Sequence, residues 1–276
     1  AGHLQAIPGL RSIQLNGHAV PAPMGPNHAS RFTSHVPAFT LKASKLGVTL
    51  GKHPILHDLS FSAAGGSIVA IAGRNGVGKT TLLRALAGLQ KHSGTVTAEG
   101  TTPDLGLVFQ NPDLQLFNSS VREEILYRVP EPDMTLYVWL MEALGLTPYE
   151  NTPPLLLSEG EKKRVALALV LMHRPRHGIL LDEPSLGQDA AYKETLIHLC
   201  RALAAAGKLV ILTTHDLALA AQANRLLLLG DEGFAADGPP TDVLRDADAW
   251  SRAGLPTPAL RILREPEVLG KPEVYP

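Results

Sequence analysis

Residues 73–81 read Gly-Arg-Asn-Gly-Val-Gly-Lys-Thr-Thr and decide the fold of this chain. The stretch fits the pattern G-x-x-x-x-G-K-[S/T], and it lies between a short β-branched run at 67–72 and a helical pattern at 79–89. Its glycines let the backbone turn tightly enough to point successive N–H groups at phosphate oxygens. The sequence therefore predicts a strand, a phosphate-binding loop and a helix in this order, with a nucleoside triphosphate as the ligand.

Two side chains of this loop have specific expected roles. We expect the Lys79 ammonium to contact the β- and γ-phosphates and the Thr80 hydroxyl to coordinate Mg²⁺, while the helix N-terminus adds its dipole. The residues expected to bind the triphosphate are Gly73, Arg74, Asn75, Gly76, Val77, Gly78, Lys79, Thr80 and Thr81.

A second motif, Gly-Ile-Leu-Leu-Asp-Glu-Pro at 178–184, ends an apolar run with two carboxylates. A buried strand would deliver Asp182 to its carboxyl end, where a carboxylate can complete the coordination of Mg²⁺. The adjacent Glu183 can then polarise the attacking water as a general base. The two motifs together predict hydrolysis of the triphosphate.

The composition excludes several classes of protein. The 276 residues are 45% hydrophobic and 18% charged, which is enough for one or two domains with a stable core. Cys200 is the single cysteine, so no internal disulfide is expected, and the apolar run at 165–172 is far shorter than the roughly 20 residues of a membrane span. No secretory pattern opens the chain, so we expect a soluble cytosolic protein. A net charge of -1 and 5% aromatic residues argue against nucleic acid as a partner.

The chain divides into an irregular start and an ordered remainder. Residues 1–38 are rich in proline and glycine and read as a tail or linker, in which His3, His18, His28 and His35 lack the spacing of metal ligands. From residue 39 short strands alternate with helices, which indicates an α/β core with a mainly parallel sheet. We expect strands at 39–50, 55–63, 67–72, 95–98, 106–109, 178–181, 208–213 and 225–229. We expect helices at 79–89, 158–172 and 190–206, with two or three more between 120 and 146.

The helix expected at 158–172 begins with a mixed charge cluster. Its basic residues Lys162, Lys163 and Arg164 stand beside two glutamates, which predicts a solvated helix face.

Further motifs in the same order give the chain a family resemblance. From about residue 40 to 255 it resembles the ATP-binding-cassette (ABC) ATPases: Leu157-Ser-Glu-Gly-Glu161 resembles the signature loop, and Ser185-Leu-Gly-Gln-Asp189 resembles the D-loop. Gln110 after Val108-Phe109 resembles the Q-loop residue, and His215 resembles the switch histidine. The resemblance implies a P-loop NTPase core at 39–255 with an antiparallel β subdomain, a helical subdomain at about 111–175, and a C-terminal tail at 256–276.

The resemblance also implies a head-to-tail dimer that encloses two ATP molecules. Each site would combine the phosphate-binding loop of one subunit with the signature loop of the other, where Ser158 Oγ and the Gly160 N–H contact the γ-phosphate. Asp189 would link the two sites. The implied catalytic residues are Glu183, His215 and Gln110, and the implied magnesium ligands are Thr80, Gln110 and Asp182.

Residues 108–117 give a narrower resemblance, to the Q-loop region of energy-coupling-factor ATPases, which power the uptake of vitamins and transition-metal ions; the C-terminal segment 253–258 is similar to that group too. This implies three partners at the cytoplasmic face of the membrane: a second ABC ATPase, identical or a sibling, a transmembrane scaffold, and a solute-binding membrane component. Three alternatives stay open: another importer ATPase, a soluble cassette acting on nucleic acid or ribosomes, and a regulatory half with weak hydrolysis. The solute itself is selected by other chains.

The chain departs from the family pattern in three places. Leu50 stands where an aromatic ring usually lies under the adenine, which forfeits stacking worth about 1 kcal/mol. The stretch between the Q-loop and the signature loop is short, so we expect a trimmed helical subdomain. The signature loop carries Glu159 in place of glycine and Glu161 in place of glutamine.

The two signature-loop glutamates allow two arrangements. A carboxylate that faces the γ-phosphate would oppose closure of the dimer, since like charges a few ångströms apart repel by about 1 kcal/mol even in water. Alternatively both side chains point outward and pair with Lys162 or Lys163 at the start of the helix, where acidic residues are favoured by the dipole. We expect the outward arrangement for Glu161 and the repulsive one for Glu159.

Overall fold

The computed structural model describes residues 14–15, 18–19 and 39–258, and within them a six-stranded sheet in the order β11-β10-β5-β9-β8-β7 forms the core. The strand β11 pairs antiparallel with β10, and the other neighbours are parallel. The strands are β5 (Ile68–Gly73), β7 (Leu105–Val108), β8 (Gly178–Asp182), β9 (Leu209–Thr213), β10 (Arg225–Gly230) and β11 (Gly233–Gly238). The predicted α/β fold with a mainly parallel sheet is confirmed.

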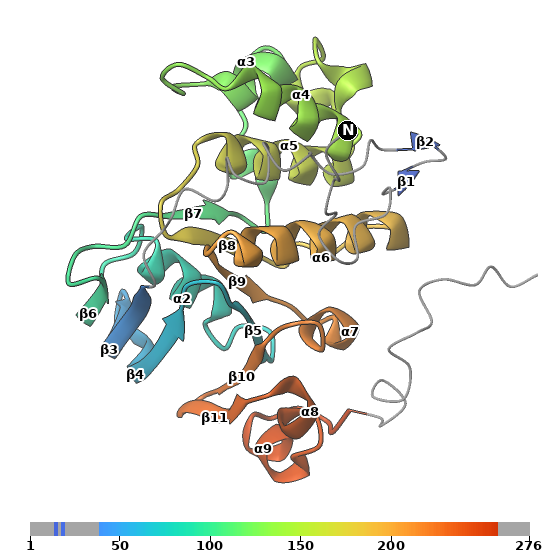
Figure 1. The fold of residues 1–276 in the computed structure, drawn as a ribbon. Coiled ribbons are helices and arrows are strands. Elements are labelled where there is room, and N and C mark those ends of the chain that lie inside the picture. The colour runs from blue at the N-terminus through green and yellow to red at the C-terminus, as the bar shows by residue number, and fades with distance from the viewer. Residues whose placement is uncertain (1–13, 16–17, 20–38, 259–276) are drawn as a thin grey trace, which may run out of the picture.

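The two faces of this sheet pack into two separate apolar clusters. Along β5, Ile68 and Ala70 join one cluster and Val69 and Ile71 join the other, because alternate side chains of a strand point to opposite faces. Helix α2 (Lys79–Leu86) covers one face, and α5 (Glu159–Met172) and α6 (Ala190–Ala205) cover the other (Figure 1). Strands buried on both faces are typical of parallel sheets, and β5, β8 and β9 are buried at every residue.

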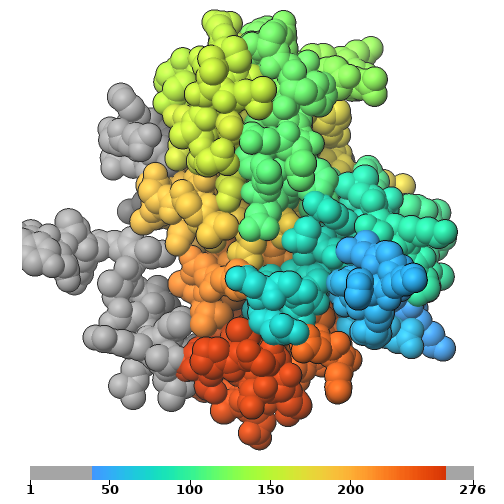
Figure 2. All heavy atoms as spheres, turned by 180° about the vertical axis from the view of Figure 1, so that it is seen from behind, coloured from blue at the N-terminus to red at the C-terminus, as the bar shows by residue number. Residues whose placement is uncertain are grey.

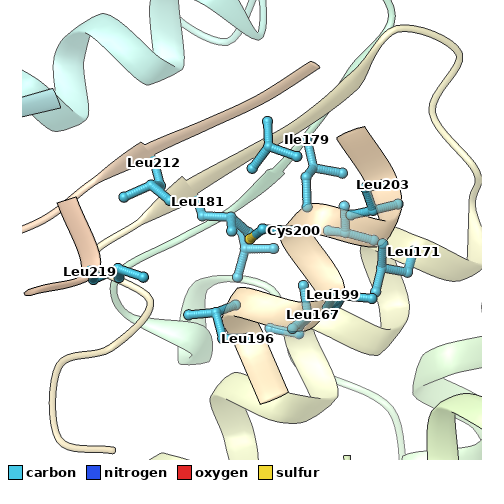
Figure 3. Packing of buried hydrophobic residues seen from close by; sticks show 14 of the residues in the cluster. Leu167, Leu171, Ile179, Leu181, Leu196, Leu199, Cys200, Leu203, Leu212 and Leu219 are labelled. Carbon is cyan, nitrogen blue, oxygen red and sulfur yellow. The ribbon is translucent and has the colours of Figure 1, made fainter. Parts of the chain in front are cut away.

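One side of α6 forms part of the second of these interfaces. Leu196, Leu199, Cys200 and Leu203 are buried, and Figure 3 shows them packed with residues of α5, β8 and β9. Aliphatic side chains from these four elements surround Cys200, which is buried. Burial raises the pKa of its thiol to about 12.

A second, antiparallel sheet lies beside α2, at one side of the core (Figure 1). Its order is β4-β3-β6, with β3 (Thr40–Leu50), β4 (His53–Ala64) and β6 (Ser93–Ala98). Burial in β4 alternates along much of the strand, as expected for a sheet with one solvated face. The buried residues of this sheet belong to the same cluster as α2, so the sheet fixes the position of the phosphate-binding loop and its helix.

The helices α3 (Val121–Leu126) and α4 (Met134–Ala143) lie with α5 at one end of the molecule (Figures 1 and 2). They fall within the segment where two or three helices were expected. The short turns η1 (Pro112–Leu114), η2 (Thr147–Tyr149) and η3 (Pro154–Leu156) connect these elements. At the opposite end β11, α8 (Pro240–Val243) and α9 (Ala247–Arg252) follow one another, and α7 (Leu217–Ala220) lies between β9 and β10.

The terminal segments lie mostly outside the described residues. Of the predicted tail at 1–38, the structure describes the antiparallel pair β1 (Gln14–Leu15) and β2 (His18–Ala19). Three of the four tail histidines and residues 259–276 of the predicted C-terminal tail lie outside the described part of the chain. Within that part, no helix combines the length and the apolar character needed to cross a membrane.

The prediction of a solvated basic face at the start of α5 is wrong. Lys162, Lys163 and Arg164 are all buried, with at most 9% of the residue surface exposed. Lys162 contacts the carboxylate of Asp113, Lys163 donates to a backbone carbonyl, and the Arg164 guanidinium lies 5.1 Å from the ring centroid of Tyr192. The charge pattern predicted exposure because the residues that contact these side chains belong to other elements. Those contacts cannot be seen in the local sequence.

We expect Leu167→Ala to lower the free energy of unfolding by about 2–5 kcal/mol, because the side chain fills the interface between α5 and the sheet and is 1% exposed. The matched control is Leu156→Ala, at a leucine that is 76% exposed, for which a change within about 0.5 kcal/mol is expected. Urea unfolding followed by circular dichroism measures both. Equal losses for the two variants would contradict the packing described for α5.

Candidate nucleotide-binding site

The glycine-rich loop 73–81 joins β5 to α2 and adopts a conformation that only glycine tolerates at two positions. Gly76 and Gly78 have φ of 79° and 109°, in the left-handed region. A Cβ atom at Gly78 would lie 2.7 Å from Leu56 Cδ2, so the loop packs closely against β4. No side chain caps the N-terminus of α2, which leaves the N–H groups of its first turn for an anionic ligand.

Lys79 is folded back into the loop that presents it. Its Nζ atom donates to the carbonyl oxygens of Gly73 at 2.8 Å and Arg74 at 3.1 Å, and lies 3.1 Å from His215 Nε2. Burial lowers the pKa of Lys79, and the carboxylates of Glu183 and Asp182 oppose that effect. The loop therefore holds a cation against neutral acceptors, ready to meet phosphate oxygens.

Asp182, the last residue of β8, is held by hydroxyl groups on both of its oxygens. Thr80 Oγ1 donates to Oδ2 and Thr213 Oγ1 donates to Oδ1, each at 2.7 Å. The Thr80 hydroxyl and the Asp182 carboxylate are hard oxygen donors in direct contact, and this pair fits Mg²⁺. Among the described residues His, Cys, Asp and Glu form no group of three or more that could hold a metal, so the other ligands would be phosphate oxygens and water.

Glu183 follows Asp182 in a strained backbone conformation with φ of 48°. The backbone N–H of Glu183 donates to Thr213 Oγ1 at 3.1 Å. Glu183 Oε2 accepts a hydrogen bond from the backbone N–H of His215 at 3.2 Å. Its Oε1 is buried, lies 3.1 Å from His215 Nε2 and accepts no hydrogen bond from the described residues. Burial raises the pKa of Glu183, and His215 and Lys79 offset this only in part. A buried carboxylate of raised pKa suits a general base.

These groups line one cleft with a volume of about 300 Å³. It gathers residues from the glycine-rich loop, the ends of β7 and β8, and the segment after β9. Its lining comprises Asn75, Gly76, Gly78, Lys79, Thr80, Thr81, Gln110, Asp182, Glu183, Leu186 and His215. The sequence motifs thus meet in space, because the carboxyl ends of parallel strands share one edge of the sheet.

Several predicted site residues lie elsewhere. Arg74 pairs with Asp231 at 2.5 Å, and Val77 is buried in the apolar cluster beneath the loop. Leu50 is 43% exposed and does not line the cleft. Ser158, Gly160 and Asp189 also lie outside the cleft of their own subunit.

In the signature loop Ser158 caps α5 and is bound by Glu161. The Ser158 N–H and Oγ–H both donate to Glu161 Oε2, at 2.8 and 2.7 Å, and the Glu161 N–H donates back to Ser158 Oγ. Burial alone would raise the pKa of the Glu161 carboxyl, but hydrogen bonds from Tyr149 and Ser158 bring it below the usual value. Glu161 is therefore a carboxylate anion, and it accepts the hydrogen bond that the Ser158 hydroxyl donates.

The repulsive arrangement expected for Glu159 is not the one in the structure, because this side chain pairs with Lys162 as in the outward arrangement. Its carboxylate is 69% exposed and lies 3.2 Å from the Lys162 ammonium. Glu161 pairs with neither lysine and binds the helix N-terminus instead.

Sequence reasoning missed two residues that shape the cleft. Thr213 fixes both Asp182 and Glu183, and its position at the end of an expected strand, just before His215, was the available signal. Gln115 holds the segment that carries Gln110: its Oε1 accepts the Phe109 N–H at 2.9 Å, and its Nε2 donates to the Leu107 carbonyl at 3.0 Å.

Comparisons with known proteins agree with this geometry. Residues 56–186 match the family model described as ABC transporter. Over 225 residues the chain is 35% identical to the energy-coupling factor transporter ATP-binding protein EcfA of Methanothermobacter thermautotrophicus, covering 74% of this chain and 72% of that protein. Over 230 residues it is 36% identical to the hemin import ATP-binding protein HmuV of Rhodococcus jostii, covering 76% and 78%. The structure of cbiO1 from Clostridium perfringens, part of the ABC transporter complex cbiONQ, is similar with a TM-score of 0.65 at 25% identity, over 79% of this chain and 95% of that one.

We expect Lys79→Ala to abolish measurable ATP binding, because the variant loses both the charge on the phosphates and the contacts that shape the loop. Isothermal titration with ATP and Mg²⁺ measures this. The control is Lys91→Ala, at an exposed lysine beyond the end of α2. Unchanged affinity in Lys79→Ala would contradict the assignment of the phosphate site.

Proposed function

The chain belongs to the ATP-binding family of ABC transporters, and we propose that it is the ATPase subunit of an energy-coupling-factor importer for a vitamin or a transition-metal ion. The observation that carries the ATPase assignment is the single cleft in which Lys79, Asp182 and Glu183 converge. The similarity to an energy-coupling factor ATP-binding protein and the Q-loop segment at 108–117 support the importer type.

The residues of the cleft have complementary roles toward ATP. The first turn of α2 and Lys79 bind the phosphates, and Gln110 and His215 orient the γ-phosphate and the attacking water. Glu183, whose pKa is raised by burial, accepts the proton of that water. Thr80, Asp182 and Gln110 would hold Mg²⁺, which when bound neutralises charge on the phosphates.

The site needs a second ATPase subunit. Leu186, which is 55% exposed, lines the cleft, whereas Ser158, Gly160 and Asp189 lie outside it. We infer that these residues serve the cleft of a partner cassette in a head-to-tail dimer, identical or a sibling. Donors supplied by a partner would stabilise the dispersed charge of the γ-phosphate only after the dimer closes.

An exposed apolar segment supports a membrane scaffold as the further partner. Leu114 and Phe117 are 61% and 62% exposed on the chain between Gln110 and α3. The backbone there is fixed, because the buried Glu124 accepts the N–H groups of Phe117 and Asn118 at 2.8 and 2.7 Å. Movement of this segment by a scaffold would therefore reach Gln110 in the cleft, and the chain would act at the cytoplasmic face of the membrane.

A second function, a regulatory half with weak hydrolysis, is favoured by one contact. The Ser158 hydroxyl that would meet the partner's γ-phosphate donates instead to the anionic Glu161. If this contact persists in the closed dimer, the partner's ATP loses a donor and gains a nearby negative charge.

We expect Glu183→Gln to bind ATP like the parent while hydrolysis nearly stops, because the amide keeps the shape of the carboxylate but cannot take a proton. The variant should then run as an ATP-held dimer in gel filtration with ATP and Mg²⁺. Glu232→Gln, at an exposed glutamate after β10, is the control and should turn over ATP like the parent. A Glu183→Gln variant that hydrolyses normally, or stays monomeric at all ATP concentrations, would count against the proposal.

We expect Glu161→Gln to raise the steady-state ATPase rate several-fold, because glutamine keeps the helix cap but removes the negative charge beside the Ser158 hydroxyl. Rates are compared at matched dimer concentration, with Glu142→Gln on the exposed side of α4 as the control. An equal or lower rate would mean that Glu161 does not restrain the site and would remove the support for a regulatory half.

A further inference from the structure

The D-loop, residues 185–189, has few contacts of its own. It follows Glu183 and Pro184 and leads into α6, and its internal hydrogen bonds are those of turns: the Leu186 N–H to the Glu183 carbonyl at 3.3 Å and the Gln188 N–H to the Ser185 carbonyl at 3.2 Å. Leu186 is 55% exposed and lines the nucleotide cleft. The position of this loop therefore depends on what it touches outside itself.

Besides α6, which Asp189 caps, the loop contacts the first turns of α5, the helix that begins at the signature loop. Lys163 Nζ donates to the Leu186 carbonyl at 2.7 Å, and Gln188 Nε2 donates to the Gly160 carbonyl at 3.4 Å. The Arg164 guanidinium lies 3.7 Å from the Asp189 carboxylate. The Lys163 contact is the shortest of the three and ends on the D-loop backbone, so it restrains the path of the chain.

Lys163 is buried, and the loss of water around its ammonium group costs free energy. The residue is 8% exposed, and burial lowers the pKa of its ammonium, while Glu159, Glu183 and Asp182 oppose that effect. It lines a small cavity together with Asp182 and Pro184, and Asp182 also lines the nucleotide cleft. A methionine would fill this space without burying a charge, so the contact with Leu186 is the specific contribution of the ammonium.

The two ends of this contact belong to different nucleotide sites of the proposed dimer. Ser158 and Gly160, at the start of α5, would face the ATP of the partner, whereas Glu183 and Leu186 face the ATP of their own subunit. We propose that Lys163 is a positioning residue that ties the D-loop to the signature helix, so that each subunit couples the state of its own cleft to the loop it offers its partner. The coupling between sites rests on the proposed function, whereas the tie itself is a property of the single chain.

The tie is tested first without nucleotide, by hydrogen exchange and mass spectrometry on the whole chain. In Lys163→Met we expect the amides of residues 186–189 to exchange about tenfold faster than in the parent, because a hydrogen bond from a charged group is lost. Lys208→Met is the matched control: its Nζ donates to the carbonyls of Pro175 and Arg176, before β8 rather than after it, so faster exchange should appear there and not in the D-loop. Lys163→Gln, whose shorter side chain cannot reach Leu186, should behave like Lys163→Met.

The catalytic consequence is then tested by ATPase kinetics and ATP binding. Lys163→Met should lower kcat about tenfold with unchanged ATP affinity, and Lys163→Arg, which keeps a charged donor, should restore most of kcat.

Parent-like exchange at 186–189 in folded Lys163→Met would overturn the tie, and so would loss of the fold in both neutral variants, because Lys163 would then be a determinant of the core. Fast exchange with parent-like kcat would overturn the catalytic consequence. If the parent protein shows no ATPase activity, the proposed ATPase function is contradicted. The hydrogen-exchange result alone then tests whether Lys163 holds the D-loop.

Discussion

The pair of hydrogen bonds on Asp182 is the interaction on which the site depends. One carboxylate oxygen accepts the hydroxyl of Thr80 and the other accepts that of Thr213. Thr80 starts the helix after β5, Thr213 ends β9, and Asp182 ends β8, so one side chain joins three neighbouring strand ends. Because Glu183 and His215 follow directly on two of these strands, their mutual geometry is set by the same clamp. Without these hydrogen bonds the glycine-rich loop and Glu183, the proposed general base, would be carried by independent loops.

The electrostatics of the cleft follow from the short distances between its charged groups. Two carboxylates, one ammonium and one imidazole lie within a partly enclosed space, and each is partly satisfied by a neighbour. Lys79 is held by carbonyls that phosphate oxygens can replace, and burial keeps the pKa of Glu183 raised. An anionic ligand would therefore exchange contacts with groups already in place, and little reorganisation is needed at the moment of reaction. Ser158, the donor proposed for the partner's ATP, is the exception, since its hydroxyl already donates to Glu161.

Much of the fold followed from the sequence, because its signals are local. The loop at 73–81 and the apolar runs of β5, β8 and β9 predicted the parallel core, which the structure confirms. The helices α7, α8 and α9 were not predicted, because each is too short to show a period. The strand β11 was not predicted, because its sequence GFAADG has no β-branched residue and no long apolar run. The motifs located the cleft, but the partners of Lys163 and the second hydroxyl on Asp182 come from distant segments. Their roles could only be seen once the strands were placed beside one another.

The central claim is that this chain carries half of a catalytic site that a second cassette completes. It is tested most directly by the specific ATPase activity as a function of protein concentration, with light scattering on the same samples. The account predicts that activity per chain rises with concentration and follows the fraction of dimer. Constant specific activity, down to concentrations at which light scattering shows monomer alone, would contradict it.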